Sequence, residues 1–540
     1  MKSTMNIGLS LLIATALLGL EQSAAQQVGA VGSHREVTWE QGPDSPIDSD
    51  ARRPNIVLIV ADDLGWNDLT FNGGGVAKGT VPTPNIDSIA KAGATFKNGY
   101  SASGTCAPSR AAIMSGRYPT RFGFEFTPTP PGMLPMIARS AGKQNPPLIT
   151  YFDEKKTVPY PEMGMPTSEV TLAETLKASG YHTAHIGKWH LGRTNGMSPN
   201  DQGFDESLLM ASGKYLPDDD PNVVNSKQDF DPIDRFLWMG MQYATSFNSG
   251  EIFEPGGYIT DYYTDEAVKV IEANKNRPFF LYLAHWAPHT PLQATKADYD
   301  ALDHIEDHTE RVYAAMIRAL DRGVGRVLDS LKEQGLEDDT LVMFTSDNGG
   351  AGYLGLPEVN QPFRGWKITY FEGGIHVPYF MKWPGKIEPG TTFDKPVHHF
   401  DLYATAAGAA QASVPTDRPM DGTNLLPFVT GDGAPKDAPH DKLFWRGGHY
   451  QVAMADGYKL QRADRPDKVW LFNLNEDPTE QNNIADDNPE IVARMCAMLD
   501  EHNEDQIETA WPALLESPIR IDKTLKDERT DQDEYVYWPN

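Results

Sequence analysis

Four stretches of the chain share one pattern, an apolar run that stops at polar or charged residues. They are residues 55–65, 181–192, 279–289 and 340–350. Near-continuous Val, Ile, Leu and Phe is typical of strands covered on both faces, as in parallel or mixed sheets. Helical patterns such as LAETLKASG and RVYAAMIRALDRGVGRVLDSLKEQG lie between them. This alternation predicts an α/β fold with a large, mostly parallel sheet between helices, and ligands beyond the carboxyl ends of the strands.

The pattern changes near residue 426, which suggests a second unit in a chain too long for one ordinary core. Short aromatic-rich segments and turns precede a helical pattern at 488–501. We therefore predict a large domain at 54–425 and, at 426–540, a subdomain with a small antiparallel sheet and a helix. The charged tail from Asp522 is expected to lie on the surface.

The first 25 residues have the features of a secretory signal. Lys2 precedes an apolar run at 7–20, and the small residues Ser23 and Ala25 follow. The run is shorter than a membrane-spanning helix of about 20 residues, which argues against a membrane anchor. We predict cleavage near Ala25, a periplasmic or secreted protein, and a linker or surface arm at 26–53.

Charge and cysteine content narrow the function classes. The net charge of −28 argues against nucleic acid as a partner, since phosphate backbones bind basic surfaces. An anionic substrate would need local Arg and Lys residues to overcome this charge. The two cysteines, Cys106 and Cys496, lie far apart in different contexts, so we expect no disulfide between them.

The string Cys-Ala-Pro-Ser-Arg at 106–110 predicts the beginning of a helix. Pro108 suits the first turn, and Gly116 suits the position after the last turn. Cys106 and Arg110 are then neighbours at the helix N-terminus, where an anion is stabilised. A small buried cysteine beside a surface arginine is the structural alternative.

Polar residues also follow two of the predicted strands. Asp62 and Asp63 follow the first, and Asp347 and Asn348 follow the last. Each pair alone is typical of a turn or helix cap. Together they supply hard oxygen ligands for Ca²⁺ or Mg²⁺.

Four basic residues could supply the positive charge that an anionic substrate needs. Lys188 and His190 are two apart in an extended segment and so lie on the same side, and His289 and Lys367 follow later in the chain. Each of them taken singly is better explained as a solvated lysine or a capped surface histidine.

The segment CAPSRAAIMSGR at 106–117 resembles the signature of the formylglycine-dependent (type I) sulfatases, in the alkaline phosphatase superfamily. The resemblance extends from Pro54 to about Asp486 and includes all the clusters above. It implies an alkaline phosphatase-like fold and oxidation of Cys106 to formylglycine by a formylglycine-generating enzyme. In that family one hydroxyl of the hydrated aldehyde attacks sulfur and expels the alcohol, which leaves a sulfated hemiacetal. The second hydroxyl then drives out sulfate and restores the aldehyde.

The same resemblance implies the site. One Ca²⁺ ion is bound by the formylglycine at Cys106 together with Asp62, Asp63, Asp347 and Asn348. Asp347 is the expected base for the diol, and Arg110 braces the formylglycine. The remaining roles are sulfate binding by Lys188 and Lys367, contact with the formylglycine by His190, and protonation of the leaving alkoxide by His289, with Lys367 as a second candidate.

We therefore predict an exported sulfatase that acts on a sulfated carbohydrate. The signal, the acidic surface and an insert-like stretch at 126–165 favour an algal-type polysaccharide or its oligosaccharides. Two alternatives remain open. The first is a phosphonate monoester or phosphodiester hydrolase with the same formylglycine site, and the second is an inactive glycan-binding protein on this scaffold.

Overall fold

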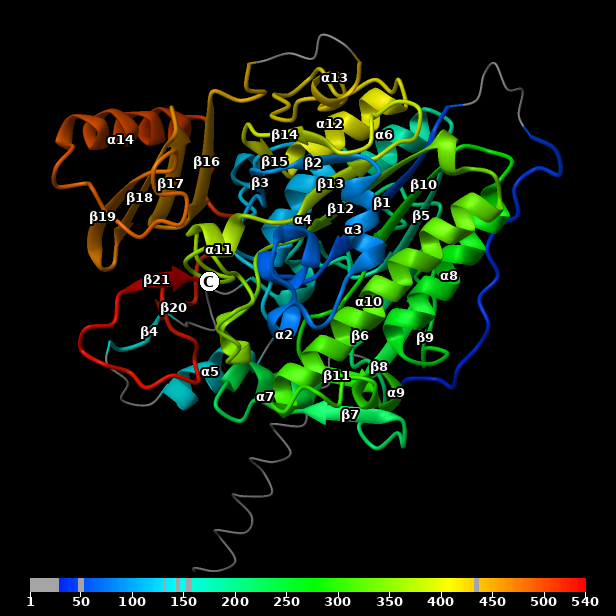
Figure 1. Ribbon diagram of the computed structural model, residues 1–540, viewed down its shortest axis with the longest axis horizontal. Helices are drawn as coiled ribbons and strands as arrows, with labels where there is room; N and C mark the ends of the chain where they lie inside the picture. The colour runs from blue at the N-terminus through cyan, green and yellow to red at the C-terminus, as the bar shows by residue number, and fades with distance from the viewer. Residues whose placement is uncertain (1–28, 47–52, 131, 142–145, 152–157, 432–436) are drawn as a thin grey trace, which may run out of the picture.

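The computed structural model describes residues 29–46, 53–130, 132–141, 146–151, 158–431 and 437–540 (Figure 1). The predicted secretory signal lies outside these residues. No helix in the described ranges is both long enough and apolar enough to cross a membrane.

The four predicted apolar stretches form the centre of the large sheet. Among the described residues, ten strands pair in the order β14-β2-β13-β12-β1-β10-β5-β6-β8-β9. The predicted stretches became β1 (Asn55–Ala61), β5 (His182–Gly187), β10 (Phe279–Ala284) and β12 (Thr340–Ser346). With β6 (Glu206–Gly213) they run parallel to one another. The predicted fold class is confirmed.

The edges make the sheet mixed. On one side of this parallel centre, β13 (Tyr379–Lys382) is antiparallel to β12 and to β2 (Ala94–Phe96), and β14 (Thr391–Phe393) follows. On the other side, β8 (Tyr243–Phe247) and β9 (Ile252–Phe253) are antiparallel.

Alternate residues of β1 supply two hydrophobic cores, because successive side chains of a strand point to opposite faces. Val57 and Ile59 pack in the core that includes α3 (Pro84–Lys91), α8 (Ile259–Asn274) and α10 (His308–Glu333). Ile56 and Leu58 pack in the core on the opposite face. That core includes α4 (Cys106–Ser115), α6 (Leu172–Ala178) and α12 (Phe400–Ala409).

The C-terminal part contains the predicted small sheet. Residues 442–473 form β16 (Lys442–Gly447), β17 (Tyr450–Ala455), β18 (Tyr458–Asp464) and β19 (Asp467–Asn473), paired antiparallel in this order. The predicted helix is α14 (Pro489–Glu504), which packs on β17 (Figure 1). The boundary at residue 425 remains a prediction.

The expectation of a surface tail from Asp522 holds for residues 526–532, which are exposed, but it is wrong for residues 535–540. β20 (Leu515–Arg520) pairs with β21 (Tyr535–Pro539) and with β4 (Ile149–Thr150), which lies in the insert-like stretch 126–165. Val536 and Tyr537 are buried. Aromatic and β-branched residues near the end of the charged segment complete a strand, which the local excess of charge had obscured.

Candidate active site

Helix α4 begins at the residue singled out in the sequence, Cys106, and ends at Ser115. The next residue, Gly116, has a φ of 68°, and a Cβ there would lie 2.8 Å from the Tyr403 ring, so glycine is required. Cys106 is buried, and burial raises the pKa of its thiol. Neither Cys106 nor Cys496 is in a disulfide, as predicted.

Arg110, one turn further along α4, is fully buried between two carboxylates. Its Nη2 lies 2.8 Å from Asp347 Oδ2 and 3.2 Å from Asp62 Oδ2, and Nη1 donates to the Lys188 carbonyl at 3.1 Å. Burial lowers the pKa of Arg110, but Asp347 and Asp62 outweigh this and hold it above its usual value. The buried cation thereby connects the ends of three strands, β1, β5 and β12.

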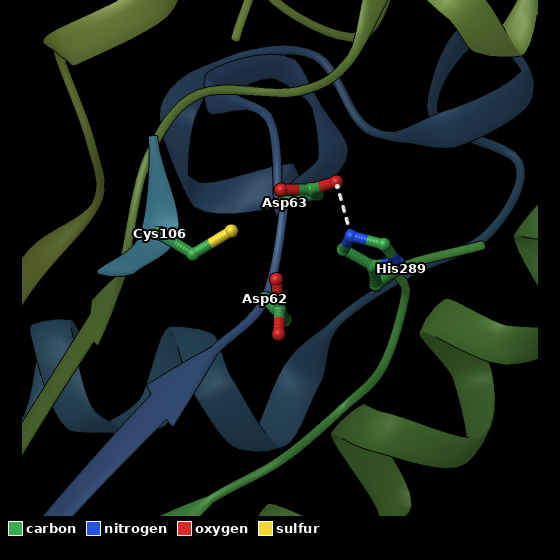
Figure 2. Close-up of side chains that lie close together, drawn as sticks. All are labelled: Asp62, Asp63, Cys106 and His289. Carbon is green, nitrogen blue, oxygen red and sulfur yellow. Dashed lines mark ion pairs between the residues drawn. The ribbon is translucent and has the colours of Figure 1, made fainter. Parts of the chain in front are cut away.

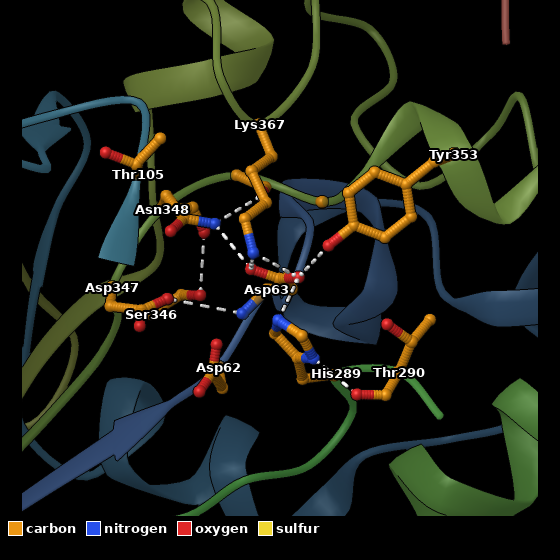
Figure 3. A network of polar contacts seen from close by, with 12 residues as sticks. Asp62, Asp63, Thr105, His289, Thr290, Ser346, Asp347, Asn348, Tyr353 and Lys367 are labelled. Atoms are coloured by element: carbon orange, nitrogen blue, oxygen red, sulfur yellow. Dashed lines mark hydrogen bonds and ion pairs between the residues drawn. The ribbon is translucent and has the colours of Figure 1, made fainter. Parts of the chain in front are cut away.

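Two lysines neutralise the aspartates that follow β1. Lys188 Nζ lies 2.6 Å from Asp62 Oδ2, and Lys367 Nζ lies 2.6 Å from Asp63 Oδ1 (Figure 3 draws the second pair). Burial and the neighbouring Asp347 raise the pKa of Asp62 to about 7, against the effects of Lys188 and Arg110. Lys188 and Lys367 come from distant segments of the chain and meet only in the folded protein.

A compact group of possible metal ligands lies at the same place. One ligand atom each of Asp62, Asp63, Cys106 and His289 lies within 4.8 Å of the others (Figure 2). Asp347 and Asn348 adjoin this group. The Asp63 amide donates to Asp347 Oδ1 at 3.3 Å, and Asn348 Nδ2 donates to Asp63 Oδ1 at 2.8 Å (Figure 3).

The oxygen atoms of the group fit a hard cation. Asp62 Oδ1 and Asn348 Oδ1 are both buried, and neither accepts a hydrogen bond from any described residue. Buried polar atoms without a protein partner are rare in native proteins, and a bound ion or water can satisfy them. Carboxylate and amide oxygens are the ligands that Ca²⁺ and Mg²⁺ prefer.

His289 lies at the edge of this group, stacked on Trp286 with ring centroids 3.9 Å apart. Its Nδ1 is 2.6 Å from the Thr290 carbonyl oxygen, which favours a proton on Nδ1, and its Nε2 is 3.5 Å from Asp63 Oδ2. Burial, followed by Lys367 and Lys188, holds its pKa well below the usual value. His289 is therefore neutral near pH 7 in the protein without substrate.

His190 resembles His289 in having a lowered pKa, and its backbone conformation is uncommon for a residue other than glycine. Its φ is 65°, in the left-handed region, and no described residue bonds its buried Nδ1. Burial, followed by Lys188 and Arg110, holds its pKa well below the usual value. Such a ring is a neutral imidazole that can donate or accept a hydrogen bond.

Two aromatic residues of the site had not been identified from the sequence. Tyr353 donates its hydroxyl to Asp63 Oδ2 at 2.9 Å, and Lys188 Nζ lies 4.6 Å from the centroid of Trp286. Trp286 could have been found from its place three residues before His289. Nothing in the local sequence of Tyr353 points to the site.

A cavity of about 600 Å³ opens from Cys106 toward solvent, and we call it the active-site cavity. Besides Lys188, His190, His289 and Lys367, parts of three distant segments line it: residues 127–130 with Met133, α7 (Pro232–Gly240) and β21 with Asn540. Asn540 Nδ2 donates to Thr129 Oγ1 at 2.8 Å, and the Thr127 amide donates to Asn540 Oδ1 at 2.8 Å. Described residues of the insert-like stretch 126–165 thus contribute to a wall of the cavity.

Trp538 of β21 belongs to the same wall. It packs against a small hydrophobic cluster of Leu134, Ile137 and Leu515, which α5 (Met133–Ala141) and β20 contribute. Because its indole is half-buried and also lines the cavity, one part of its surface is available to a bound ligand.

Comparisons with known proteins identify the family of the chain. Residues 54–412 match the family model "Sulfatase", and residues 365–506 match "N-sulphoglucosamine sulphohydrolase, C-terminal". A sulfatase of Formosa agariphila is 30% identical over 81% of this chain and 85% of its own. Human N-acetylgalactosamine-6-sulfatase is 33% identical over 75% and 71%, respectively. The crystal structure of Ps i-CgsB in complex with k-i-k-neocarrahexaose has 31% identity and a TM-score of 0.69, covering 85% of this chain and 95% of that one.

Proposed function

This chain belongs to the sulfatase family and is a sulfuric ester hydrolase, and we propose that it removes sulfate from a sulfated glycan with a formylglycine derived from Cys106. The observation that carries the proposal is the convergence of Cys106, Lys188 and Lys367 on the buried carboxylates at the end of β1. A formylglycine-generating enzyme is the partner that this maturation requires.

The position of Cys106 supports its conversion and use. It lies at the first residue of α4, where the helix dipole favours negative charge, and Lys188 and Lys367 both act on its thiol electrostatically. A formylglycine hydrate there would supply a nucleophilic hydroxyl and a second hydroxyl for release of sulfate. Its hydroxyls would adjoin Asp347, our candidate base, and His190, our candidate hydrogen-bonding partner.

The cationic residues have separate tasks in this proposal. Arg110, fully buried and bonded to Asp347, holds the carboxylates and the first turn of α4 in register. Lys188 and Lys367 line the active-site cavity and bind the sulfate oxygens. His289 presents Nε2 toward the site while Nδ1 is engaged by the Thr290 carbonyl, so Nε2 is the atom that passes a proton to the leaving alkoxide. The negative charge of a bound sulfate ester opposes the effect of the lysines on His289 and favours its protonation.

A Ca²⁺ ion would be held by Asp62, Asp63, Asp347 and Asn348 with the residue at position 106. The unpartnered oxygens of Asp62 and Asn348 support this ligand set. When bound, the ion supplies positive charge that polarises the sulfate ester and stabilises the nucleophilic oxygen.

The substrate class follows from the relatives and from the cavity. One relative is named N-acetylgalactosamine-6-sulfatase, and another, Ps i-CgsB, has a crystal structure in complex with k-i-k-neocarrahexaose. Both names support a sulfated sugar as the substrate. A cavity of about 600 Å³ is large enough for a sugar ring beyond the sulfate. We also propose export, for which the pattern at residues 1–25 is the support.

Sulfate release from a panel of defined sulfated oligosaccharides, measured on protein whose formylglycine content is known, tests the proposal. Aryl phosphonate and phosphodiester substrates belong in the same panel, because they test the alternative hydrolase activity. Release of sulfate with higher kcat/KM than any phosphorus ester supports the proposal. Turnover of the phosphorus esters alone, or of no substrate by fully converted protein, contradicts it.

A further inference from the structure

The charge of the residues that line the active-site cavity differs from that of the chain as a whole. The chain has 75 Asp and Glu residues and a net charge of −28, yet no described residue that lines the cavity is acidic. Three described Lys or Arg residues line it, namely Lys188, Lys367 and Arg193. The described lining of the cavity therefore carries basic residues and no acidic ones, although the protein as a whole is acidic.

These three cations differ in how their charge is balanced. Lys188 is neutralised by Asp62 and Lys367 by Asp63, each at 2.6 Å. Arg193 instead donates from Nη1 to the Ala211 carbonyl at 2.8 Å and from Nη2 to the Met210 carbonyl at 3.3 Å. No carboxylate in the described part of the chain lies within ion-pair distance of Arg193, so its positive charge has no acidic partner among those residues.

The loop that carries Arg193 is held on both sides of it. Gly192 has a φ of 105°, and a Cβ there would lie 2.6 Å from Met197 Cβ. Thr194 Oγ1 donates to the Pro161 carbonyl at 2.5 Å. The two carbonyl contacts, on residues of β6, fix the guanidinium further. They use two of its five N–H donors, and the remaining donors are available to a ligand.

We propose that Arg193 binds a second anionic group of the substrate, a sulfate ester or a carboxylate, while the sulfate to be removed lies between Lys188 and Lys367. This inference rests on the proposed function and names the substrate class more closely, as a glycan unit with two negative charges. A planar guanidinium with free N–H donors suits both groups, because each presents two oxygens to it. Arg193 lies three residues beyond His190, within the same loop after β5.

A purely structural role for Arg193, fastening the loop to β6, makes a different prediction. Loss of the two carbonyl contacts would disturb the neighbouring His190 and affect all substrates alike. Loss of an anion subsite affects only substrates with the second charge. The comparison of matched ligands therefore separates the two roles.

Calorimetric binding to the Cys106→Ser protein, which needs no turnover, is the direct test. The probes are a panel of methyl galactoside monosulfates, the corresponding disulfates, and monosulfated methyl galactosiduronates. Arg193→Gln is compared with the parent, with Arg193→Lys, and with Lys386→Gln, which removes one exposed charge away from the cavity. We expect Arg193→Gln to weaken binding of the best doubly charged probe by about tenfold or more, and of the monosulfates by less than about twofold. The disulfates and the uronates distinguish sulfate from carboxylate as the second group.

Equal losses of affinity for singly and doubly charged probes overturn the proposal. It is also overturned if the parent Cys106→Ser protein binds doubly charged probes no more tightly than monosulfates, or binds neither. Failure of the proposed function has another signature. Formylglycine-loaded protein would then release no sulfate from any probe, whatever the effect of Arg193→Gln on binding.

Discussion

Lys367 Nζ lies 2.6 Å from Asp63 Oδ1, although the two residues are 304 positions apart and both are buried. Burial lowers the pKa of Lys367, but Asp63 outweighs this and holds it well above its usual value, so the lysine stays charged. A charged lysine beside a buried carboxylate and a nucleophile position can bind an anion without titrating near neutral pH.

Replacement of Lys367 therefore tests the sulfate-binding role. Lys367→Met removes the charge but keeps most of the side-chain volume, and it leaves Asp63 with Tyr353 and Asn348 as partners. We expect kcat/KM for sulfate release to fall by about 10²-fold, the typical cost of removing one donor to a developing charge. Lys386→Met is the matched control, and a loss that it shares would contradict a specific role.

A comparison of substrates with poor and good leaving groups tests whether His289 acts as the general acid. If its Nε2 protonates the departing alkoxide, His289→Ala should reduce kcat/KM on sugar sulfates by about 10²-fold or more. On p-nitrophenyl sulfate, whose leaving group needs little protonation, the loss should be less than about tenfold. The measurement is a pair of kcat/KM ratios from one protein preparation. Equal losses on the two substrates would remove His289 from the acid role.

Metal binding should be visible in stability. Addition of Ca²⁺ to chelator-treated protein should raise Tm by several degrees, because ligand at 100 times its Kd adds about 2.7 kcal/mol. Asp62 Oδ1 and Asn348 Oδ1 lack other partners among the described residues, so Asn348→Ala should reduce this rise without a comparable loss of Tm in chelator. The ligand assignment fails if the Ca²⁺-dependent rise is unchanged in this variant.

Trp538 should distinguish glycans from small esters. Because Trp538 lines the wall of the active-site cavity to which residues 127–130 and Met133 also contribute, Trp538→Ala should lower kcat/KM on a sulfated oligosaccharide by about tenfold. Trp538→Phe should retain most of the activity, and p-nitrophenyl sulfate should be turned over almost unchanged by both variants. A similar loss on both substrates would indicate that β21 only stabilises the fold.

The lowered pKa of His502 predicts a pH dependence of the free energy of unfolding. His502 stacks on Phe444 with ring centroids 4.1 Å apart, and burial, followed by Arg121, Arg446 and Lys442, lowers its pKa to about 3. The unfolded chain binds a proton near pH 6.5 that the folded protein does not, so this residue makes the free energy of unfolding decrease as pH falls from 6.5 toward 3.

The variant His502→Phe keeps an aromatic ring and removes the titration. Its unfolding free energy should depend on pH less steeply than that of the parent below about pH 6.5, by up to about 1.4 kcal/mol per pH unit. Urea unfolding between about pH 5 and 8 measures this, and parallel curves for the two proteins would refute it.

The central strands and helix α4 could be predicted from sequence because local patterns determine them. The apolar runs that became β1 and β12 end at Asp62 and Asp347, and parallel neighbours bring such ends to one edge. Pro108 and Gly116 likewise mark the limits of α4.

The cavity wall could not be predicted in this way. Trp538 reaches it only because β21 pairs with β20, which in turn pairs Glu516 with Ile149 in the insert. Arg193 was not identified from the sequence. The reason for proposing it is that it has no acidic partner among the described residues, and this can be seen only in the folded protein. Such long-range pairings leave no periodic signal in the sequence.

The most direct test of the account measures residue 106 and activity together. Protein is expressed with and without a formylglycine-generating enzyme, the peptide containing residue 106 is weighed by mass spectrometry, and sulfate release from the best sulfated oligosaccharide is measured on each sample. The account predicts that activity rises in proportion to the fraction of Cys106 converted to the aldehyde and is absent from Cys106→Ala. Equal activity in converted and unconverted protein, or in Cys106→Ala, would contradict it.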